Sequence, residues 1–321
     1  MNRKELGQTG MQLPEIGQGT SRYQGGPELL RRGVELGASL IDTAELYGNE
    51  EVVGHAIQGL RDRVVVATKT HHSKYKDVLQ CAEASLRRLR IETIDLYQLH
   101  WPNAAVPIEE TMAAMEQLVD QGKVRCIGVS NFTLPEMRQA QAALRKHRIV
   151  SNQVRYSLVD RSIEVELLHY CQAHNVTVIA YSPLAQNFQR ILEFDRDNAL
   201  EQVAAMTGKT RVQVALNWCI AKPGVIVIPK TESFDHLEEN CGASDWRLTS
   251  EQVALLERGV RCRRRSRLET ALRRFVRRTI QRIKCNIPYI IGSTKSIRSN
   301  NLIIFETVAR APGLASPCTM K

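Results

Sequence analysis

The sequence is poor in aromatic residues, in long apolar runs and in cysteine motifs. Aromatic residues make up 5% of its 321 positions, so Val, Ile, Leu and Ala must fill most of a core. No apolar run approaches the roughly 18 residues that are needed to span a bilayer. The first residues also lack the apolar segment of a secretory signal. We therefore expect a cytoplasmic protein.

The eight cysteines are scattered, without a C-x-x-C pair or a cysteine–histidine cluster at zinc spacing. We expect buried, unpaired thiols in a reducing compartment. Pairs of histidine or carboxylate ligands are also missing from the ends of the expected strands. The sequence thus predicts no metal site and disfavours a metal-dependent hydrolase.

Eight short runs rich in Val and Ile indicate β-strands. They are continuous rather than alternating, which is typical of parallel strands that are buried on both faces. The runs are Glu15–Gly19, Ser39–Asp42, Val64–Lys69, Ile94–His100, Cys126–Ser130, Val150–Val154, Val176–Tyr181 and Val225–Pro229.

The stretches between these runs carry apolar residues at three- and four-residue spacing, which indicates amphipathic helices. Eight βα units favour a (β/α)8 TIM barrel, with an open doubly wound sheet as the alternative. A dinucleotide-binding G-x-G-x-x-G fingerprint is missing, because Gly17-Gln18-Gly19 lacks the third glycine. The expected helices are Glu28–Leu36, Glu50–Gln58, Lys76–Leu89, Glu109–Gln121, Leu134–Lys146, Glu164–His174 and Val212–Ala221.

Positive charge is concentrated at the end of the sequence. Residues 258–321 hold 16 of the 44 Lys and Arg but two of the 34 acidic residues, a net charge of +14 against −4 for residues 1–257. Such asymmetry indicates a separate segment. We predict a (β/α)8 barrel catalytic domain over 1–257 and a basic extension over 258–321, partly helical and partly irregular.

The stretch from Arg258 to Lys284 has the pattern of a basic amphipathic helix. Three interpretations stay open: a solvated helix packed on the barrel, a helix on an anionic membrane surface, or binding to nucleic acid or an acidic partner. The one aromatic residue among these arginines, Phe275, lies on the apolar side of the helical pattern, so no specific nucleic acid is predicted.

Polar residues stand at the carboxyl ends of three consecutive strands of the expected barrel. Asp42 ends the second strand, Lys69 the third and His100 the fourth, while Tyr47 follows in a loop. The carboxyl ends of barrel strands meet at one mouth, and neighbouring strands lie about 4.8 Å apart. We therefore expect these four residues to converge.

This combination suits the reduction of a carbonyl group. A tyrosine is a weak acid at neutral pH, and a nearby ammonium lowers its pKa. Asp42 would keep Lys69 charged, Tyr47 would donate a proton and His100 would orient the carbonyl oxygen. The hydride must come from a cofactor, because no side chain supplies one.

Short motifs along residues 4–257 resemble, in order and spacing, those of the aldo-keto reductases, in particular bacterial-type aldehyde and diketo-sugar reductases. Together they are specific, although each alone is weak. The motifs are Ile41-Asp42-Thr43-Ala44 with Tyr47-Gly48-Asn49-Glu50, Thr68-Lys69, His100-Trp101-Pro102, Gly128-Val129-Ser130-Asn131-Phe132, Asn152-Gln153-Val154, Ala180-Tyr181-Ser182-Pro183-Leu184 and Ile228-Pro229-Lys230-Thr231 with Glu239-Asn240.

The resemblance implies a role for each matching residue. Asp42, Tyr47, Lys69 and His100 match the four catalytic positions and are called the tetrad below. Other matches imply contacts to the nicotinamide carboxamide, its ring, the pyrophosphate and the adenosine end. The expected cofactor-binding residues are Gly19, Thr20, Asp42, Ser130, Asn131, Gln153, Tyr181, Ser182, Pro183, Leu184, Lys230, Thr231, Glu232, His236, Glu239 and Asn240.

Two residues depart from the family's pattern at the adenosine end. His236 stands where an arginine often grips the 2′-phosphate of NADP, and Glu232 stands where a neutral residue is usual. A carboxylate repels a 2′-phosphate but accepts hydrogen bonds from a free ribose diol. Lys230 and a protonated His236 still favour phosphate, so we expect NADPH, with NADH as the alternative.

The resulting prediction is an NAD(P)H-dependent carbonyl reductase of the NADP-dependent alcohol dehydrogenase type, which turns aldehydes or ketones into alcohols. Tyr23, Tyr47, His100 and Trp101 are the expected substrate-contacting residues. Apolar and aromatic walls suit small aldehydes, dicarbonyls and keto-sugars alike. We expect a monomer or weak oligomer. The alternative is a cofactor-binding regulatory or adaptor protein that acts through its basic tail.

Overall fold

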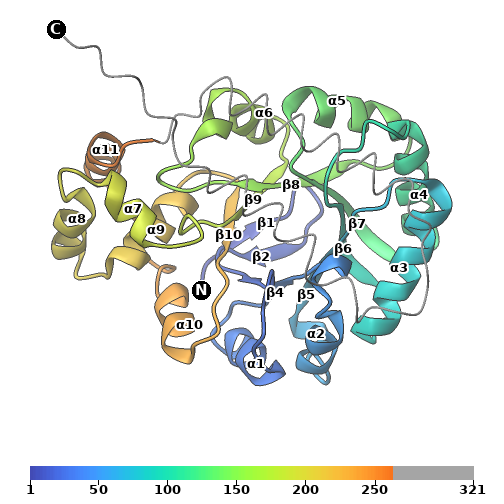
Figure 1. The fold of residues 1–321 in the computed structure, drawn as a ribbon, viewed down its shortest axis with the longest axis horizontal. Coiled ribbons are helices and arrows are strands. Elements are labelled where there is room, and N and C mark those ends of the chain that lie inside the picture. Colours follow the sequence, from blue (N-terminus) through green and yellow to red (C-terminus); the bar gives the residue numbers. More distant parts are fainter. Residues whose placement is uncertain (263–321) are drawn as a thin grey trace, which may run out of the picture. The chain divides into compact units, whose positions relative to one another are not determined.

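Eight parallel strands form the centre of the computed structural model, which describes residues 1–262 (Figure 1). They are hydrogen-bonded in the order β10-β9-β8-β7-β6-β5-β4-β3, and each pairs with its neighbour in parallel. All eight expected strands are therefore confirmed. Their bounds are β3 (Gln18–Gly19), β4 (Leu40–Asp42), β5 (Val65–Thr70), β6 (Ile94–Leu99), β7 (Val124–Ser130), β8 (Ile149–Arg155), β9 (Thr177–Tyr181) and β10 (Val225–Ile228).

The seam between β3 and β10 closes the barrel. Ile16 bridges Val227, the Gly17 amide donates to the Val227 carbonyl at 2.8 Å, and the Gly19 amide donates to the Pro229 carbonyl at 3.2 Å. A Cβ at Gly19 would lie 2.7 Å from the carbonyl oxygen of Ile228. A glycine is therefore needed for the two backbones to approach this closely. The fold is the predicted (β/α)8 TIM barrel.

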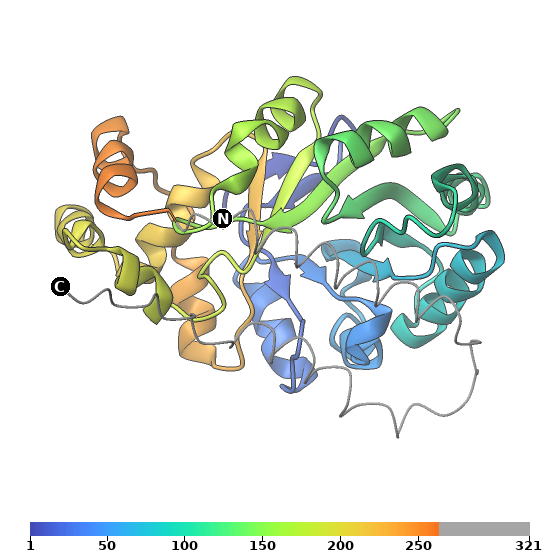
Figure 2. The same cartoon turned by 45° about the horizontal axis from the view of Figure 1, so that its top comes forward.

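Helices surround the strands in both views (Figures 1 and 2). Thr133, Thr210 and Thr249 begin α5, α9 and α11 with capping boxes, and positive φ angles at Gly37 and Gly122 follow α1 and α4. The bounds are α1 (Pro27–Glu35), α2 (Glu50–Ala56), α3 (Tyr75–Leu89), α4 (Ile108–Asp120), α5 (Leu134–Ala143), α6 (Leu167–Ala173), α7 (Gln189–Phe194), α8 (Ala199–Thr207), α9 (Arg211–Ile220), α10 (Phe234–Cys241) and α11 (Ser250–Gly259), with 3-10 turns η1 (Glu45–Tyr47), η2 (Arg61–Arg63) and η3 (Ser162–Val165).

An antiparallel hairpin of β1 (Arg3–Glu5) and β2 (Gln12–Pro14) lies near the middle of the ring of strands (Figure 1). Its Leu6 and Leu13 are fully buried and belong to the same cluster as inward-facing strand residues such as Leu40. The hairpin therefore covers the amino-terminal end of the barrel. Strands of three residues are too short to show an alternating pattern, so this hairpin could not be predicted.

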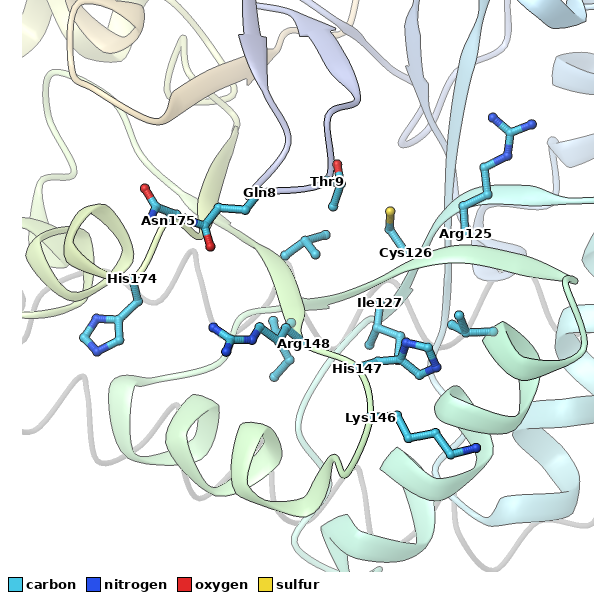
Figure 3. Close-up of a pocket in the computed structure, with 13 residues that line it drawn as sticks. Gln8, Thr9, Arg125, Cys126, Ile127, Lys146, His147, Arg148, His174 and Asn175 are labelled. Carbon is cyan, nitrogen blue, oxygen red and sulfur yellow. The ribbon is translucent and has the colours of Figure 1, made fainter.

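A hollow of about 300 Å³ lies beside this hairpin (Figure 3). It is lined by Gln8 and Thr9, by Arg125 near the start of β7, and by Arg148 and His174 in the segments before β8 and β9. These residues precede or begin their strands, so the hollow lies at the opposite end of the barrel from the tetrad. Ligands of such barrels bind at the carboxyl ends of the strands instead.

The six cysteines among residues 1–262 are all unpaired, and four of them are buried. Cys285 and Cys318 lie outside the described residues. Within residues 1–262, no helix is long and apolar enough to cross a membrane.

Val260, just beyond the predicted boundary, packs against residues of the barrel domain. Val260 is fully buried and bridges Asp195, and the Arg161 guanidinium donates to the Val260 carbonyl at 3.1 Å. The basic helix expected from Arg258 to Lys284 lies almost wholly outside the described residues. The division of the chain at 257 and 258 stays a prediction.

Candidate active site

A buried ion pair lies at the carboxyl ends of β4 and β5. Lys69 Nζ is 2.6 Å from Asp42 Oδ1 and donates to the Thr43 carbonyl at 2.8 Å, and the Lys69 residue is 0% exposed. The second carboxylate oxygen of Asp42 accepts from the side-chain amides of Gln98 at 3.3 Å and Gln153 at 2.7 Å. Four hydrogen bonds from three side chains thus hold the carboxylate and the ammonium in place.

The Lys69 ammonium is retained despite its burial. Burial acts to lower its pKa, but Asp42, and then Tyr47, outweigh that effect and raise it. Ion pairs in a protein interior survive only with such close geometry and additional hydrogen bonds. The pair therefore places a fixed positive charge below the mouth of the barrel.

Tyr47 and His100 lie above this charge. Tyr47 ends η1, and its ring centroid is 5.1 Å from Lys69 Nζ. The Tyr47 hydroxyl is 3.5 Å from His100 Nε2, and the two rings meet edge to face with centroids 5.6 Å apart. Asn49 fixes the loop by donating to the Thr20 carbonyl at 2.7 Å. The structure thus brings all four tetrad residues together.

One expectation about Tyr47 is wrong. The Lys69 ammonium does lower the pKa of this phenol, but burial raises it more and Asp42 adds to the rise, so the pKa lies above 10.0. The reason is that desolvation of a phenolate outweighs one positive charge that is already neutralised by a carboxylate. In this state the hydroxyl holds its proton at neutral pH.

A group of hydroxyl and amide side chains lies beside the tetrad. The Ser130 hydroxyl donates to the Gln153 carbonyl at 3.0 Å, and Asn131 Nδ2 donates to Ser130 Oγ at 3.0 Å and to the His100 carbonyl at 3.1 Å. Asn131 Oδ1 accepts from the Tyr181 hydroxyl at 2.9 Å. Asn131 has a φ of 64°, a left-handed conformation that asparagine tolerates better than most residues. Ser130, Asn131, Gln153 and Tyr181 therefore form one connected group.

The loops after β9 and β10 contain six more of the expected cofactor residues, namely Ser182, Pro183, Leu184, Lys230, Thr231 and Glu232. Ser182, Pro183 and Leu184 directly follow β9, and Ser182 has a φ of 50°. After β10, Lys230 Nζ lies 2.7 Å from Glu232 Oε1, which also accepts from the Gln24 amide at 3.1 Å.

Helix α10 contains the last three expected cofactor residues, His236, Glu239 and Asn240. The Ser233 hydroxyl caps this helix by accepting from the His236 amide, and Thr231 Oγ1 accepts from the Ser233 amide at 3.1 Å. His236 is exposed, Glu239 is half-buried and Asn240 is buried. Lys230 precedes α10 and His236 lies in its first turn, and both are exposed, while the first turn also carries the acidic Asp235. The amino-terminal end of a helix favours anions.

The expected substrate residues differ in their exposure. Trp101 follows β6 and is 38% exposed, as a pocket wall should be. Tyr23 is buried, and its hydroxyl donates to the Gly26 carbonyl at 2.7 Å, so the hydroxyl proton is already used within the protein. Gly19 and Thr20 lie in the seam and beneath the mouth, where Thr20 Oγ1 donates to the Asp42 carbonyl at 3.0 Å.

Sequence reasoning missed Gln98 and Glu45. Gln98 lies two residues before His100 in β6, and the strand's alternation was the available signal that it points inward with Leu96. Glu45 begins η1 and gave no signal, because its partners come from β5 and from the segment that follows it.

A (β/α)8 barrel with this arrangement at the carboxyl ends of its strands is typical of the barrel oxidoreductases. The model of the Aldo/keto reductase family matches residues 9–260, and the chain belongs to that family.

Relatives agree with this assignment. The chain is 38% identical over 258 residues to methylglyoxal reductase YeaE of Escherichia coli K12, a match that covers 77% of the chain and 90% of the relative. It is 33% identical to aldo-keto reductase YhdN of Bacillus subtilis 168, covering 78% and 91%. A crystal structure of an aldo/keto reductase from Klebsiella pneumoniae with NADP and acetate superposes with a TM-score of 0.72 at 39% identity, covering 79% of this chain and 94% of that one.

Proposed function

We propose that this protein reduces an aldehyde or ketone to an alcohol with NADPH, and that Tyr47 is the general acid. The observation that carries the proposal is the buried Asp42–Lys69 pair under the Tyr47 ring, with His100 Nε2 3.5 Å from the hydroxyl. Burying two charges is costly unless they have a use. Stabilising the phenolate left by proton donation is such a use.

The residues beside the tetrad fit a nicotinamide. A carboxamide offers one acceptor and two donors, and Ser130, Asn131 and Gln153 provide one hydroxyl and two amides. The half-buried Tyr181 ring lies next to them and would support the flat nicotinamide. Ser182–Leu184 would follow the pyrophosphate. When bound, the reduced nicotinamide supplies the hydride.

The tetrad handles the proton and the carbonyl oxygen. His100 and Tyr47 would both hydrogen-bond that oxygen, which fixes the carbonyl plane before reaction. As negative charge develops on the oxygen, Tyr47 donates its proton. The Lys69 ammonium, held by Asp42, stabilises the resulting phenolate. The raised pKa of Tyr47 does not oppose this step, because an alkoxide is a stronger base than a phenolate.

The residues at the adenosine end favour NADPH over NADH, but only weakly. Lys230 and the first turn of α10 attract a 2′-phosphate, and the Klebsiella relative binds NADP. The Glu232 carboxylate neutralises Lys230 at 2.7 Å, however, and its pKa is lowered chiefly by the Lys230 hydrogen bond. We therefore propose use of NADPH, with NADH as a weaker second cofactor.

The substrate class follows from the site and from one relative. Trp101 gives the mouth one apolar wall, and the relative from Escherichia coli is a methylglyoxal reductase. We propose small aldehydes and dicarbonyls, with methylglyoxal as the first compound to test. No described residue favours the adaptor alternative.

The test is consumption of reduced nicotinamide by the full-length protein with methylglyoxal, using NADPH and NADH in parallel. Tyr47→Phe is expected to lower kcat by about 10²–10⁴-fold and to leave cofactor affinity near normal, because the hydroxyl acts in the transition state. Tyr170→Phe, a change on α6, is the matched control and should keep full turnover. If Tyr47→Phe kept most of its kcat, the proposed mechanism would be refuted.

A further inference from the structure

A cluster of potential metal ligands lies behind Tyr47, outside the tetrad. Glu45 begins η1, His72 follows β5, and Cys81 lies in the second turn of α3. One ligand atom from each of these three residues lies within 4.8 Å of the other two. The cluster thus joins three segments that are separate in the sequence.

The Glu45 carboxylate is held in position and ionised. Its Oε1 accepts from the Thr70 hydroxyl at 2.8 Å and from the His71 amide at 2.9 Å, and His71 Nδ1 lies 2.9 Å from the same atom. Burial acts to raise the pKa of Glu45, but His71 and then His72 outweigh it and lower the pKa to about 2. An anionic oxygen is therefore present in the cluster at all ordinary pH values.

The other members are a buried thiol and a half-exposed ring. Cys81 is 1% exposed, and burial first and Glu45 second raise the pKa of its thiol, so the sulfur is protonated when no cation is bound. His72 is half-buried, and its ring lies against that of His71 with centroids 4.1 Å apart. A cation could reach the cluster from the side of the two histidines.

A buried phenol faces the same place. The Tyr97 hydroxyl on β6 lacks a hydrogen-bond partner of good geometry among residues 1–262, although its surroundings include Glu45, Cys81 and Thr70. A buried polar atom left without a partner requires an explanation. A ligand in the cluster would give this hydroxyl an acceptor or a water to bind.

We propose that Glu45, His72 and Cys81 form a site for Zn²⁺ that clamps η1 to β5 and α3. Carboxylate oxygen, imidazole nitrogen and thiolate sulfur are the ligands that zinc prefers. One carboxylate and one thiolate neutralise the two positive charges, so the occupied site carries no net charge into the interior. His71 or a water supplies the fourth ligand.

Occupation needs a small rearrangement and a proton release. At zinc distances of about 2.0–2.3 Å, tetrahedral ligands lie about 3.3–3.8 Å apart. Atoms that lie up to 4.8 Å apart must therefore approach by up to about 1–1.5 Å, which requires the half-buried His72 ring to rotate. The Cys81 S–H bond breaks, its proton leaves to solvent and a sulfur–zinc bond forms, with no change in oxidation state. This proposal does not depend on the proposed reductase activity.

The test is titration of the reduced, metal-stripped, full-length protein with Co²⁺ alone and then with Zn²⁺. We expect one equivalent of Co²⁺ to give thiolate-to-cobalt charge transfer and tetrahedral ligand-field absorption, and Zn²⁺ to displace it and raise Tm. Cys81→Ser should abolish the charge-transfer band, and Cys171→Ser, another fully buried cysteine, should keep it.

A second variant keeps the test decisive if Cys81→Ser does not fold. His72→Asn changes a half-buried loop residue and should weaken Co²⁺ binding by at least about tenfold, whereas His174→Asn should not. No charge-transfer band in the wild type, or a band unchanged in Cys81→Ser or in His72→Asn, would overturn the proposal. In that event the cluster is a set of internal hydrogen bonds around Glu45.

Discussion

The two halves of the Asp42–Lys69 pair should contribute unequally to stability. Removing one partner of a buried ion pair costs about 3–5 kcal/mol, because the other charge stays buried without compensation. After Lys69→Met, the Asp42 carboxylate keeps the amide donors of Gln98 and Gln153. After Asp42→Asn, the ammonium keeps only neutral oxygens, from Thr43 and Tyr47.

The size of the difference follows from the lost partners. Each hydrogen bond to a charged group contributes about 1.5–3 kcal/mol, so we place Lys69→Met near 3 kcal/mol and Asp42→Asn near 5 kcal/mol. For a domain of this size these values correspond to falls in Tm of about 6–12 °C and about 10–20 °C. The double variant, Asp42→Asn with Lys69→Met, should lose about 1–2 kcal/mol of unfolding free energy, because it leaves no charge buried.

These differences in stability are measured by thermal unfolding, at neutral pH and without cofactor, of the wild type, the two single variants and the double variant. Asp120→Asn is the matched control, since Asp120 pairs with Lys146 and His147 on the surface and its loss should change Tm little. All tetrad variants should be inactive whatever their stability. If Asp42→Asn were no less stable than Lys69→Met, or the double variant no more stable than either, the two amides would not carry the role given to them here.

Three further predictions concern the cofactor, the acid and the seam. Glu232→Gln should raise the preference for NADPH over NADH by about three- to tenfold in kcat/KM, because it frees Lys230 and removes a charge that repels phosphate. Equal gains for both cofactors would contradict this. The reduction rate at saturating cofactor should stay flat up to about pH 9, since Tyr47 must be protonated and burial raises its pKa; activity is lost only as the pH rises through that pKa. A loss of activity already near neutral pH would show that a group other than Tyr47 donates the proton. Gly19→Ala should destabilise by about 1–3 kcal/mol in urea unfolding, because its Cβ would meet the Ile228 carbonyl at 2.7 Å, and an unchanged midpoint would show that the seam can widen.

The barrel could be predicted because its strands carry a local signal. The run Val225–Ile228 is apolar on both faces, and Val65–Thr70 is buried on both faces although it contains polar residues. Burial on both faces is typical of parallel strands. The sequence pattern does not predict helices α7, α8, α10 and α11. Helix α8 packs on α9 and α11, α10 packs on α1 and α9, and no strand lies between α7 and α9 to delimit them. The expected helix to Lys146 ends at Ala143, because Leu144 turns to an extended conformation.

The tetrad's convergence could also be predicted, since strand ends in a parallel barrel meet. Side-chain networks could not. The contact between Asp42 and Gln153 joins residues 111 positions apart, and the Glu45 cluster draws ligands from three segments without a spacing motif. The net effect on the Tyr47 pKa depends on how much burial opposes Lys69, and burial is a property of the folded structure.

The Asp42 carboxylate belongs both to the tetrad and to the hydrogen-bonded residues beside it. One of its oxygens binds Lys69, which governs the proton on Tyr47, and the other binds Gln153, which belongs to the amide group at the proposed nicotinamide position. A ligand that draws Gln153 toward itself must alter the charge balance felt by Lys69. By thermodynamic reciprocity, ionisation of Tyr47 must then alter the affinity for that ligand by the same factor. Cofactor binding and the proton affinity of Tyr47 are therefore coupled through the two oxygens of the Asp42 carboxylate.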